Sequence, residues 1–164
     1  MQKFKLIIGL GNPDPKYENT FHNVGHLFVD FSGKGVKSEV FMNKSGEFAK
    51  EQIKKNKVKP EQLLIVHDDS DIELGKYKLS FGRSSAGHRG VQNIIDQLKT
   101  QDFWRLRIGI RPPREKVRAK ADELVLKKIS PANKKKLEEV FETLARSTFR
   151  AAIGGGAKAR SFLL

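Results

Sequence analysis

The sequence predicts a single α/β domain with a mixed central sheet flanked by helices. Two apolar runs, at 6–8 and 62–66, are too short for globular helices and give way to glycine or polar residues, which is typical of buried strands. Apolar residues at helical spacing over 88–98 predict a helix, and strands that alternate with helices are typical of α/β folds. The 164 residues are enough for one domain with a sizeable core, so we expect residues 1–164 to form one unit.

The first half of the chain places turns and polar residues after the predicted strands. The segment NPDP at 12–15 excludes a helix and predicts a turn after the first strand. Residues 31–40 are too few for a helix plus a strand, so we expect a loop or a brief strand there. A helix is expected over 45–57 and is broken at 58–60. The second strand is expected to end at the acidic segment 67–71.

The second half contains further strands and a long terminal helix. Strands are expected at 77–81 and 103–110, a flexible loop at 82–87, a basic loop at 111–120 and a short element at 122–126. The last helix begins with Ser130 as N-cap and Pro131 at the first helical position. Its apolar stripe is Leu137, Val140, Phe141 and Leu144. The glycines at 154–156 are expected to end this helix, and the tail at 157–164 is expected to be flexible.

The composition excludes several classes of protein. Thirty-two Lys and Arg against nineteen Asp and Glu give a net charge of +13, which favours a nucleic-acid partner over a merely solubilising surface. The absence of cysteine excludes disulfides, cysteine-ligated zinc and thiol nucleophiles, and it fits a reducing compartment such as the cytoplasm. No run reaches the roughly 18 apolar residues of a membrane span, and we identify no signal peptide, so no membrane partner is expected.

His22 is the first candidate for catalysis, because an imidazole accepts a proton near neutral pH. A lone histidine is more often structural, but Asp68 reaches His22 if the first two strands are neighbours. A carboxylate bonded to an imidazole fixes its tautomer and stabilises its protonated form. The acidic segment 67–71 has two other interpretations, a turn built on Asp side chains and a divalent-metal loop, although its spacing lacks a calcium-loop pattern.

Other polar residues are candidates for binding. Asn12 and Asn43 are amides on different loops that together are able to hold a carbonyl oxygen or a water, although turn residues more often play a local role. His88 and Arg89 stand at the start of a helix, where backbone N–H groups favour an anion. A cluster of cations in the middle third is suited to follow a phosphate backbone: Lys78, Arg83, Arg105, Arg107, Arg111, Arg114, Lys116 and Arg118.

Two common enzyme motifs are incomplete. The turn GLG at 9–11 follows a strand as in dinucleotide-binding proteins, but Asp14 stands in place of the third glycine. The segment GRSSA at 82–86 resembles a nucleophile elbow, but it lacks the second glycine and a preceding buried strand. The sequence therefore argues against a dinucleotide cofactor and against a serine hydrolase.

Several segments occur in the order found in bacterial-type peptidyl-tRNA hydrolases. The opening GLGNPDPKYENTFHNVGHLFVD resembles the family pattern, which is close to G-N-P-x-x-x-Y-x-x-T-R-H-N-x-G. The segments FMNKSG, HDDSD, SAGHRGVQNIID and FWRLRIGI follow in the family's order, so the resemblance covers nearly the whole chain. It implies an esterase that cuts the bond between a peptide's carbonyl and the 3′ ribose of tRNA.

The resemblance also implies a role for individual residues. His22 matches the general base that activates water, Asp68 the carboxylate that supports it, and Asn12 the residue that distinguishes peptidyl-tRNA from free aminoacyl-tRNA. The remaining matches concern binding: Tyr17, Phe41 and Asn43 contact the tRNA end or the peptide, Met42 forms a wall of the site, and Lys78 and Arg107 grip tRNA phosphate.

The chain departs from the family pattern at three places. Arg89 replaces the usual Asn, so an amide that donates and accepts hydrogen bonds is replaced by a cation that only donates them. Either another residue binds the water instead, or Arg89 binds tRNA. Phe21 replaces the usual Arg before His22. Only ten residues, 31–40, stand where the family carries a helix and strands, so we expect a smaller sheet and one missing wall of the peptide groove.

The resemblance implies a cytoplasmic, monomeric enzyme that recycles tRNA. Peptidyl-tRNA is the expected partner, through its acceptor end and phosphates, and no DNA, metal or cofactor is expected. A non-catalytic RNA-binding relative is the main alternative, favoured by Arg89, Phe21 and the short segment, while the supported imidazole of His22 argues against it. A hydrolase of some other ester or amide is a third possibility.

Overall fold

The structure is a computed structural model that describes residues 4–113 and 120–147. Its strands are β1 (Leu6–Gly9), β2 (Val36–Lys37), β3 (Leu63–Glu73), β4 (Tyr77–Phe81) and β5 (Trp104–Arg111). Its α-helices are α1 (Val24–Ser32), α2 (Ser45–Asn56), α3 (Arg89–Leu98), α4 (Ala121–Leu124) and α5 (Pro131–Ser147). Short 3-10 turns are η1 (Pro15–Tyr17), η2 (Phe21–Asn23), η3 (Met42–Lys44) and η4 (Pro60–Gln62). The glycines at 154–156, the tail at 157–164 and most of the basic loop at 111–120 lie outside the described residues.

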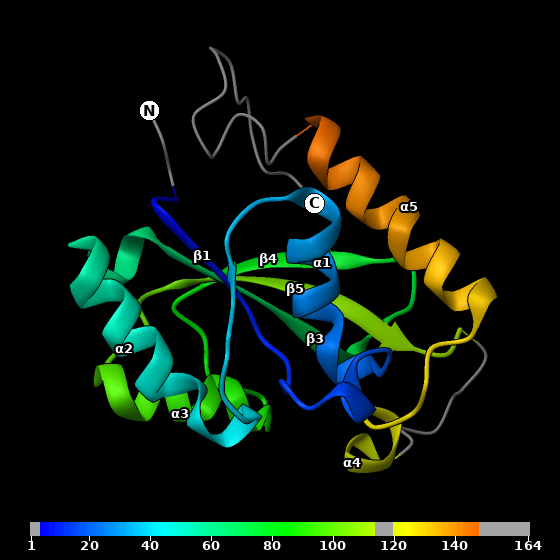
Figure 1. The fold of residues 1–164 in the computed structure, drawn as a ribbon, viewed down its shortest axis with the longest axis horizontal. Coiled ribbons are helices and arrows are strands. Elements are labelled where there is room, and N and C mark those ends of the chain that lie inside the picture. Colours follow the sequence, from blue (N-terminus) through cyan, green and yellow to red (C-terminus); the bar gives the residue numbers. More distant parts are fainter. Residues whose placement is uncertain (1–3, 114–119, 148–164) are drawn as a thin grey trace.

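The five strands form one mixed sheet in the order β2-β1-β3-β5-β4. Strand β4 pairs antiparallel with β5, whereas the other pairings are parallel. Figure 1 shows α2 and α3 on one side of this sheet and α1 and α5 on the other. The expectation of an α/β fold with a mixed sheet flanked by helices is therefore confirmed.

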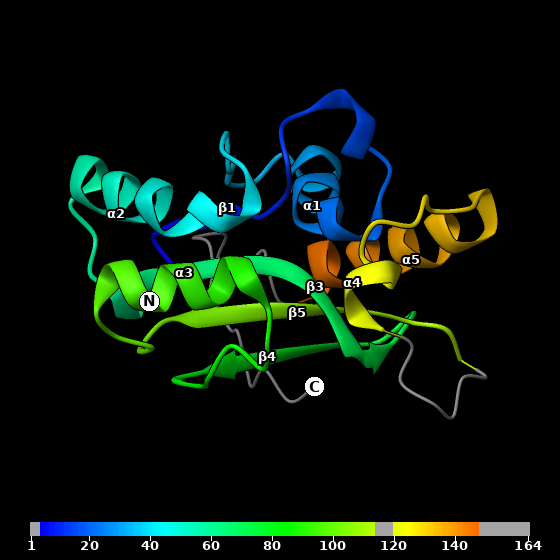
Figure 2. The same ribbon diagram turned by 90° about the horizontal axis from the view of Figure 1, so that it is seen from below.

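The connections reverse direction between β1 and β3. Helix α1 leads from β1 to the edge strand β2 on one face, and α2 returns on the opposite face to β3, the neighbour of β1 on its other side (Figures 1 and 2). In open α/β sheets such a reversal leaves a crevice at the carboxyl ends of the two strands, where ligands bind. The residues that follow β1, and the polar end of β3, therefore lie at this crevice.

Each face of the sheet has its own apolar core. On one face, residues of β1, β3 and β5 pack with α1 and with the stripe of α5, whose Leu137, Val140, Phe141 and Leu144 are all buried, as the sequence predicts. On the other face, alternate residues of β1 and β3, and Phe103 just before β5, pack with α2 and α3. The side chains of β1 and of residues 63–66 of β3 thus alternate between two buried faces, which explains why these segments are apolar runs.

Strand β3 is longer than the sequence predicts. It continues through His67–Asp71 to Glu73, so the acidic segment lies in the strand and the expectation that the strand ends there is wrong. The extension is possible because β5 pairs with β3 as far as Asp69 and again, after an irregularity, at Glu73. Asp68 is therefore fixed by a central strand rather than by a turn.

The short segment between α1 and η3 forms little regular structure. Helix α1 runs to Ser32 and ends at Gly33, whose φ of 64° is the left-handed conformation that glycine adopts readily. Strand β2 has two residues, so the expectation of a brief strand is confirmed. The edge of the sheet next to β1 is consequently covered by two residues only.

Two glycines bring α1 against the sheet. A Cβ on Gly9 would overlap the carbonyl oxygen of Gly25, and a Cβ on Gly25 would overlap the carbonyl oxygen of Val66 and the backbone nitrogen of Leu10. Because α1 follows His22 directly, this close packing sets the distance between His22 and the end of β3.

The variant Gly25→Ala is expected to lose at least about 2 kcal/mol of unfolding free energy, because backbone atoms would have to move to admit the methyl group. Urea denaturation measures the loss. Gly33→Ala is the matched control, because that site has a φ of 64° but open space, so only about 1 kcal/mol of backbone strain is expected. Equal losses in the two variants would contradict the close approach of α1.

Candidate active site

A cleft of about 650 Å³ lies at the carboxyl ends of β1 and β3. It is walled by η1, η2, η3, the end of β3, the loop before α3, and α4, and Figure 2 shows α3 and α4 beside β3. The cleft brings together most of the residues predicted from sequence: Asn12, Tyr17, His22, Phe41, Met42, Asn43, Asp68, His88 and Arg89. Lys78 and Arg107 are not among its lining residues.

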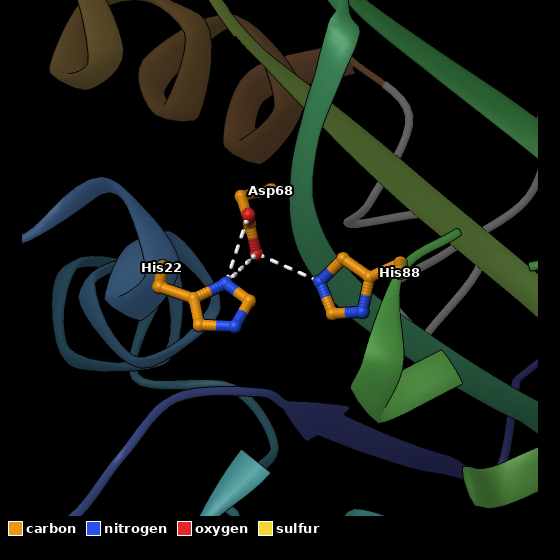
Figure 3. A group of neighbouring side chains, drawn as sticks. All are labelled: His22, Asp68 and His88. Carbon is orange, nitrogen blue, oxygen red and sulfur yellow. Dashed lines mark hydrogen bonds and ion pairs between the residues drawn. The ribbon is translucent and has the colours of Figure 1, made fainter. Parts of the chain in front are cut away.

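His22 and Asp68 are in direct contact (Figure 3). The Nδ1 atom of His22 lies 2.9 Å from Oδ2 and 3.0 Å from Oδ1 of Asp68. A carboxylate only accepts hydrogen bonds, so Nδ1 carries the hydrogen and Nε2 keeps its lone pair. No described residue forms a hydrogen bond to this Nε2, and His22 lines the cleft. The free lone pair of His22 is therefore available to a molecule in the cleft.

His88 binds the same carboxylate from the other side. Its Nδ1 accepts a hydrogen bond from the backbone N–H of Val91, 3.2 Å away, and so acts as the N-cap of α3. Nε2 consequently carries the hydrogen of the neutral ring and donates it to Oδ1 of Asp68, at 2.9 Å. Both ring nitrogens of His88 are thus engaged within the protein, and His88 holds Asp68 toward His22.

His67 packs against His88 and bonds to the backbone of Asp68. Its ring lies edge-on to that of His88, with centroids 4.6 Å apart, and its Nδ1 donates to the backbone carbonyl of Asp68 at 2.7 Å. Complete burial lowers the pKa of His67 far below 6.5, so the ring is neutral. Its Nε2 atom is a buried acceptor with no hydrogen-bond partner among the described residues.

His22 and Asp68 set each other's pKa. Burial by itself raises the pKa of Asp68, but the charge of His22 and the hydrogen bonds from His22 and His88 bring it well below its usual range, so Asp68 is ionised. Burial lowers the pKa of His22, but the charge of Asp68 and the hydrogen bond to it outweigh burial and raise the pKa above 6.5. His22 therefore becomes a free base only above this raised pKa.

Asn12 is fixed by a network of hydrogen bonds. Its backbone N–H donates to Oδ1 of Asn23 at 2.8 Å, and its carbonyl accepts from Nδ2 of Asn23 at 2.9 Å. Its side-chain Oδ1 accepts from the backbone N–H of Met42, also at 2.8 Å, which joins the loop after β1 to η3. The Nδ2 donor of Asn12 has no hydrogen bond to any described residue, and it is available to a ligand in the cleft.

Arg89 lies at the mouth of the cleft. It is 76% exposed and pairs with Asp122 of α4, with Nη2 3.6 Å from Oδ2. The pair joins the start of α3 to α4 across the opening, since both residues line the cleft. The positive charge of Arg89 lowers the pKa of His22, whereas Asp122 raises it.

Charge changes at the mouth are therefore expected to move the pH profile in opposite directions. Arg89→Ala removes a cation that opposes protonation of His22, so the acidic limb of kcat should move to higher pH. Asp122→Asn removes an anion that favours protonation, so the limb should move to lower pH. Single-turnover rates at low ionic strength measure both shifts, and a shift of the same sign in both variants would contradict this electrostatic coupling.

The predicted basic cluster is only partly at the surface. Lys78 and Arg107 lie opposite each other in the β4–β5 pairing, so they share one face of the sheet. The guanidinium of Arg107 is engaged within the protein, because its Nε donates to Oδ2 of Asp69 at 2.7 Å and its Nη1 donates to Oγ of Ser80 at 3.2 Å.

The expectation that Arg105 belongs to a phosphate-binding cluster is wrong. The residue is 3% exposed, and Nη2 donates to the carbonyl of Ser84 at 2.7 Å. Burial lowers the pKa of Arg105 to about 10. Arg105 fixes the loop before α3 and does not reach a ligand.

The structure adds residues to the site that sequence reasoning missed. The backbone N–H of His22 donates to the carbonyl of Val125 at 2.8 Å, so the segment after α4 holds the turn that carries the imidazole. Asp122 and Leu126 line the same cleft. No sequence signal links 121–126 to His22, because the contact joins segments about one hundred residues apart through backbone atoms. By contrast, the side chain of Asn23 was visible as a polar neighbour of His22.

The described residues that are close enough to contact one metal ion are His22, Asp68 and His88, whose ligand atoms lie within 4.8 Å of one another. Both imidazoles, however, donate an N–H to the carboxylate, so hydrogens occupy the side that a cation would need. This arrangement fits a supported imidazole base better than a metal centre.

An ionised carboxylate that holds an imidazole in a cleft at the carboxyl ends of parallel strands is an arrangement suited to hydrolytic α/β enzymes. A family model described as peptidyl-tRNA hydrolase matches residues 6–35 and 34–161. The chain therefore belongs to the peptidyl-tRNA hydrolase family and is an enzyme of that class.

Individual relatives agree with this assignment. The peptidyl-tRNA hydrolase of Aquifex aeolicus (strain VF5) is 36% identical over 173 positions, covering 90% of this chain and 89% of the relative. That of Sulfurihydrogenibium sp. (strain YO3AOP1) is 38% identical, covering 68% of this chain and 72% of the relative. The crystal structure of the enzyme from Acinetobacter baumannii has a TM-score of 0.80 at 27% identity, covering 93% of this chain and 90% of that one.

The short connection is visible in the comparisons. The two segments matched by the family model meet at residues 34–35, next to β2. The alignment to the Aquifex aeolicus relative has 173 positions, more than the 164 residues of this chain, so the relative carries residues that this chain lacks.

No described helix is both long enough and apolar enough to cross a membrane.

Proposed function

We propose that the chain hydrolyses the ester bond of peptidyl-tRNA, with His22 as general base, and so releases tRNA for reuse. The contact of 2.9 Å between Nδ1 of His22 and Asp68 carries this proposal, because it fixes the tautomer in which Nε2 is the base. The proposed reaction needs no metal and no cofactor. The enzyme is proposed to act as a monomer in the cytoplasm.

The proposed chemistry starts with a water between His22 and the ester carbonyl. The water oxygen bonds to the carbonyl carbon while its proton passes to Nε2 of His22, and Asp68 stabilises the imidazolium. The tetrahedral intermediate then breaks the bond to the 3′ oxygen of the ribose, and His22 returns its proton to this leaving oxygen. The products are a peptide carboxylic acid, which releases its proton to water, and a tRNA with a free 3′ hydroxyl.

The amides of the cleft are proposed to stabilise the developing oxyanion. Asn12 has a free Nδ2 donor whose position is fixed by the hydrogen bonds to Asn23 and Met42, so it needs little rearrangement on binding. Asn43 lies on η3 in the same cleft and presents a second amide. Asn12 is also proposed to distinguish peptidyl-tRNA from free aminoacyl-tRNA through the peptide's own amide groups.

The tRNA is proposed to bind through its phosphates and its 3′ end. The net charge of +13 attracts the polyanion without reading its sequence. At the cleft, Tyr17, Phe41 and Met42 offer apolar or aromatic contacts, and Arg89 is proposed to exchange Asp122 for a phosphate. Farther away, Lys78 and Arg107 are proposed to contact the acceptor stem.

A non-catalytic RNA-binding relative is the second candidate. The replacement of Asn by Arg89 favours it, because Arg89 is unable to accept a hydrogen bond from a water. The supported imidazole argues against it, since binding RNA does not require an ionised carboxylate to be buried beneath a histidine.

A steady-state assay separates the candidates. The purified chain is expected to hydrolyse N-acetyl-aminoacyl-tRNA and to leave free aminoacyl-tRNA and an N-acetyl amino acid ethyl ester nearly untouched. The KM should rise steeply with salt, because several phosphate contacts release counterions on binding. Tight tRNA binding without turnover would favour the RNA-binding relative, and equal turnover of the ethyl ester would favour a hydrolase of other esters.

A further inference from the structure

A second groove, also of about 650 Å³, adjoins the active-site cleft. It lies over the outer side of α1 and is bounded by residues 12–19, by residues 37–39 and by α5. The two hollows share Asn12. We call the new one the second groove.

The two hollows have the same walls on both sides. The chain from residue 12 to 23 contributes to both, through Asn12, Tyr17 and His22 in the active-site cleft and through Asp14, Glu18 and others in the second groove. The opposite wall is also continuous, because residues 37–39 line the second groove and residues 41–44 line the cleft. The two hollows therefore meet at Asn12, between the same two segments of the chain.

The second groove is acidic in a strongly basic protein. Five carboxylates line it, from Asp14, Glu18, Asp30, Glu39 and Glu138, against two lysines, Lys37 and Lys134. Two of the acids are already neutralised, because Asp30 lies 2.9 Å from Lys37 and Asp14 lies 3.8 Å from Lys16. The three glutamates form no ion pair with any described residue. His26 adds no charge, because burial lowers its pKa to about 4.

A donor at the junction of the two hollows is also available to a ligand. Asn12 is 8% exposed, and its Nδ2 donor has no hydrogen-bond partner within 4–113 or 120–147. Its other polar atoms are bonded to Asn23 and Met42. A peptide carbonyl that passes from one hollow to the other is a matching acceptor for this N–H group.

We propose that the second groove binds the part of the peptide that lies upstream of the ester, and that its free glutamates favour Lys or Arg side chains there. The ligand class is a cationic peptide segment in extended conformation, still attached to tRNA. This inference rests on the proposed function, since it extends the same substrate beyond the reacting carbonyl.

Three substrates on one tRNA test the inference: N-acetyl-Lys-Lys-Ala-tRNA, N-acetyl-Ala-Ala-Ala-tRNA and N-acetyl-Glu-Glu-Ala-tRNA. We expect kcat/KM to fall in this order, with the lysine substrate about three- to tenfold better than the glutamate substrate, since one exposed ion pair contributes up to about fivefold. Higher salt should shrink this ratio, and the shared tRNA cancels the salt dependence of tRNA binding itself.

Two double variants test whether the glutamates of the second groove cause the preference for the lysine substrate. In Glu18→Gln/Glu39→Gln the ratio of lysine to glutamate substrates should fall toward one. The matched control is Glu51→Gln/Glu61→Gln, which removes two exposed acids outside both hollows and should keep the wild-type ratio. Equal kcat/KM for the three substrates, or a preference that survives Glu18→Gln/Glu39→Gln, overturns the inference while the proposed function stands. Failure to hydrolyse any of the three refutes the proposed function instead.

Discussion

Replacing His22 by alanine is expected to lower the single-turnover rate on peptidyl-tRNA by about 10²–10⁴-fold, the range that a positioned general base contributes. The imidazole is the described group that combines a free lone pair, a raised pKa and contact with an ionised carboxylate in the cleft. No other described cleft residue offers the same function, because both ring nitrogens of His88 are engaged by Val91 and Asp68.

Binding of tRNA is the internal control for this variant. The Kd for deacylated tRNA should change less than about twofold, because His22 is a small part of a surface dominated by phosphate contacts. The melting temperature should fall, because the buried Asp68 carboxylate loses one of its two partners, so rate and binding are compared at a temperature where the variant is folded. Wild-type turnover in His22→Ala would reject the assignment of the base.

The variant Asp68→Asn is expected to reduce kcat by about 10³–10⁴-fold, the scale seen where an amide replaces a buried carboxylate behind a catalytic imidazole. Nδ1 of His22 lies within 3.0 Å of both carboxylate oxygens, so either orientation of the amide brings its N–H₂ against the N–H of His22. His22 would then lose the tautomer that leaves Nε2 free. Its pKa should fall as well, because the charge that raises it is gone while burial remains.

This substitution should also cost stability. Asp68 is 1% exposed, so a donor that loses its partner at this position is unable to bond to water instead. We therefore expect the free energy of unfolding to fall by about 1–3 kcal/mol. Asp96→Asn is the matched control, because Asp96 is exposed on α3 and bonded only to Gln92 among the described residues. The control should keep wild-type rate and stability. Unchanged kcat in Asp68→Asn would mean that the carboxylate does not support the base.

The sequence predicted where the candidate catalytic residues lie because they directly follow apolar strand segments. It placed Asp68 near His22 on the condition that the first two strands are neighbours. In the structure β1 and β3 are parallel neighbours, and His22 and Asp68 are in contact. The resemblance to the family added the roles of Asn12 and Met42, which the structure joins by a hydrogen bond.

What the sequence did not reveal depends on long-range packing. The continuation of β3 through the acidic segment follows from pairing with β5, and a run rich in Asp gives no local sign of a strand. The burial of Arg105 follows from its position facing the loop at 82–87, which its charge does not indicate. The hydrogen bond between His22 and Val125 joins backbone atoms, and such a bond does not require particular residue types at either position.

The most direct test compares the titration of His22 with the pH dependence of the reaction. Nuclear magnetic resonance of the ring nitrogens of His22 reports both its tautomer and its pKa, and single-turnover hydrolysis reports the acidic limb of the rate. The proposed mechanism requires the hydrogen on Nδ1 in the neutral ring, a pKa above 6.5, and an acidic limb at that same pKa. A hydrogen on Nε2, or a limb that does not follow the titration of His22, would contradict it.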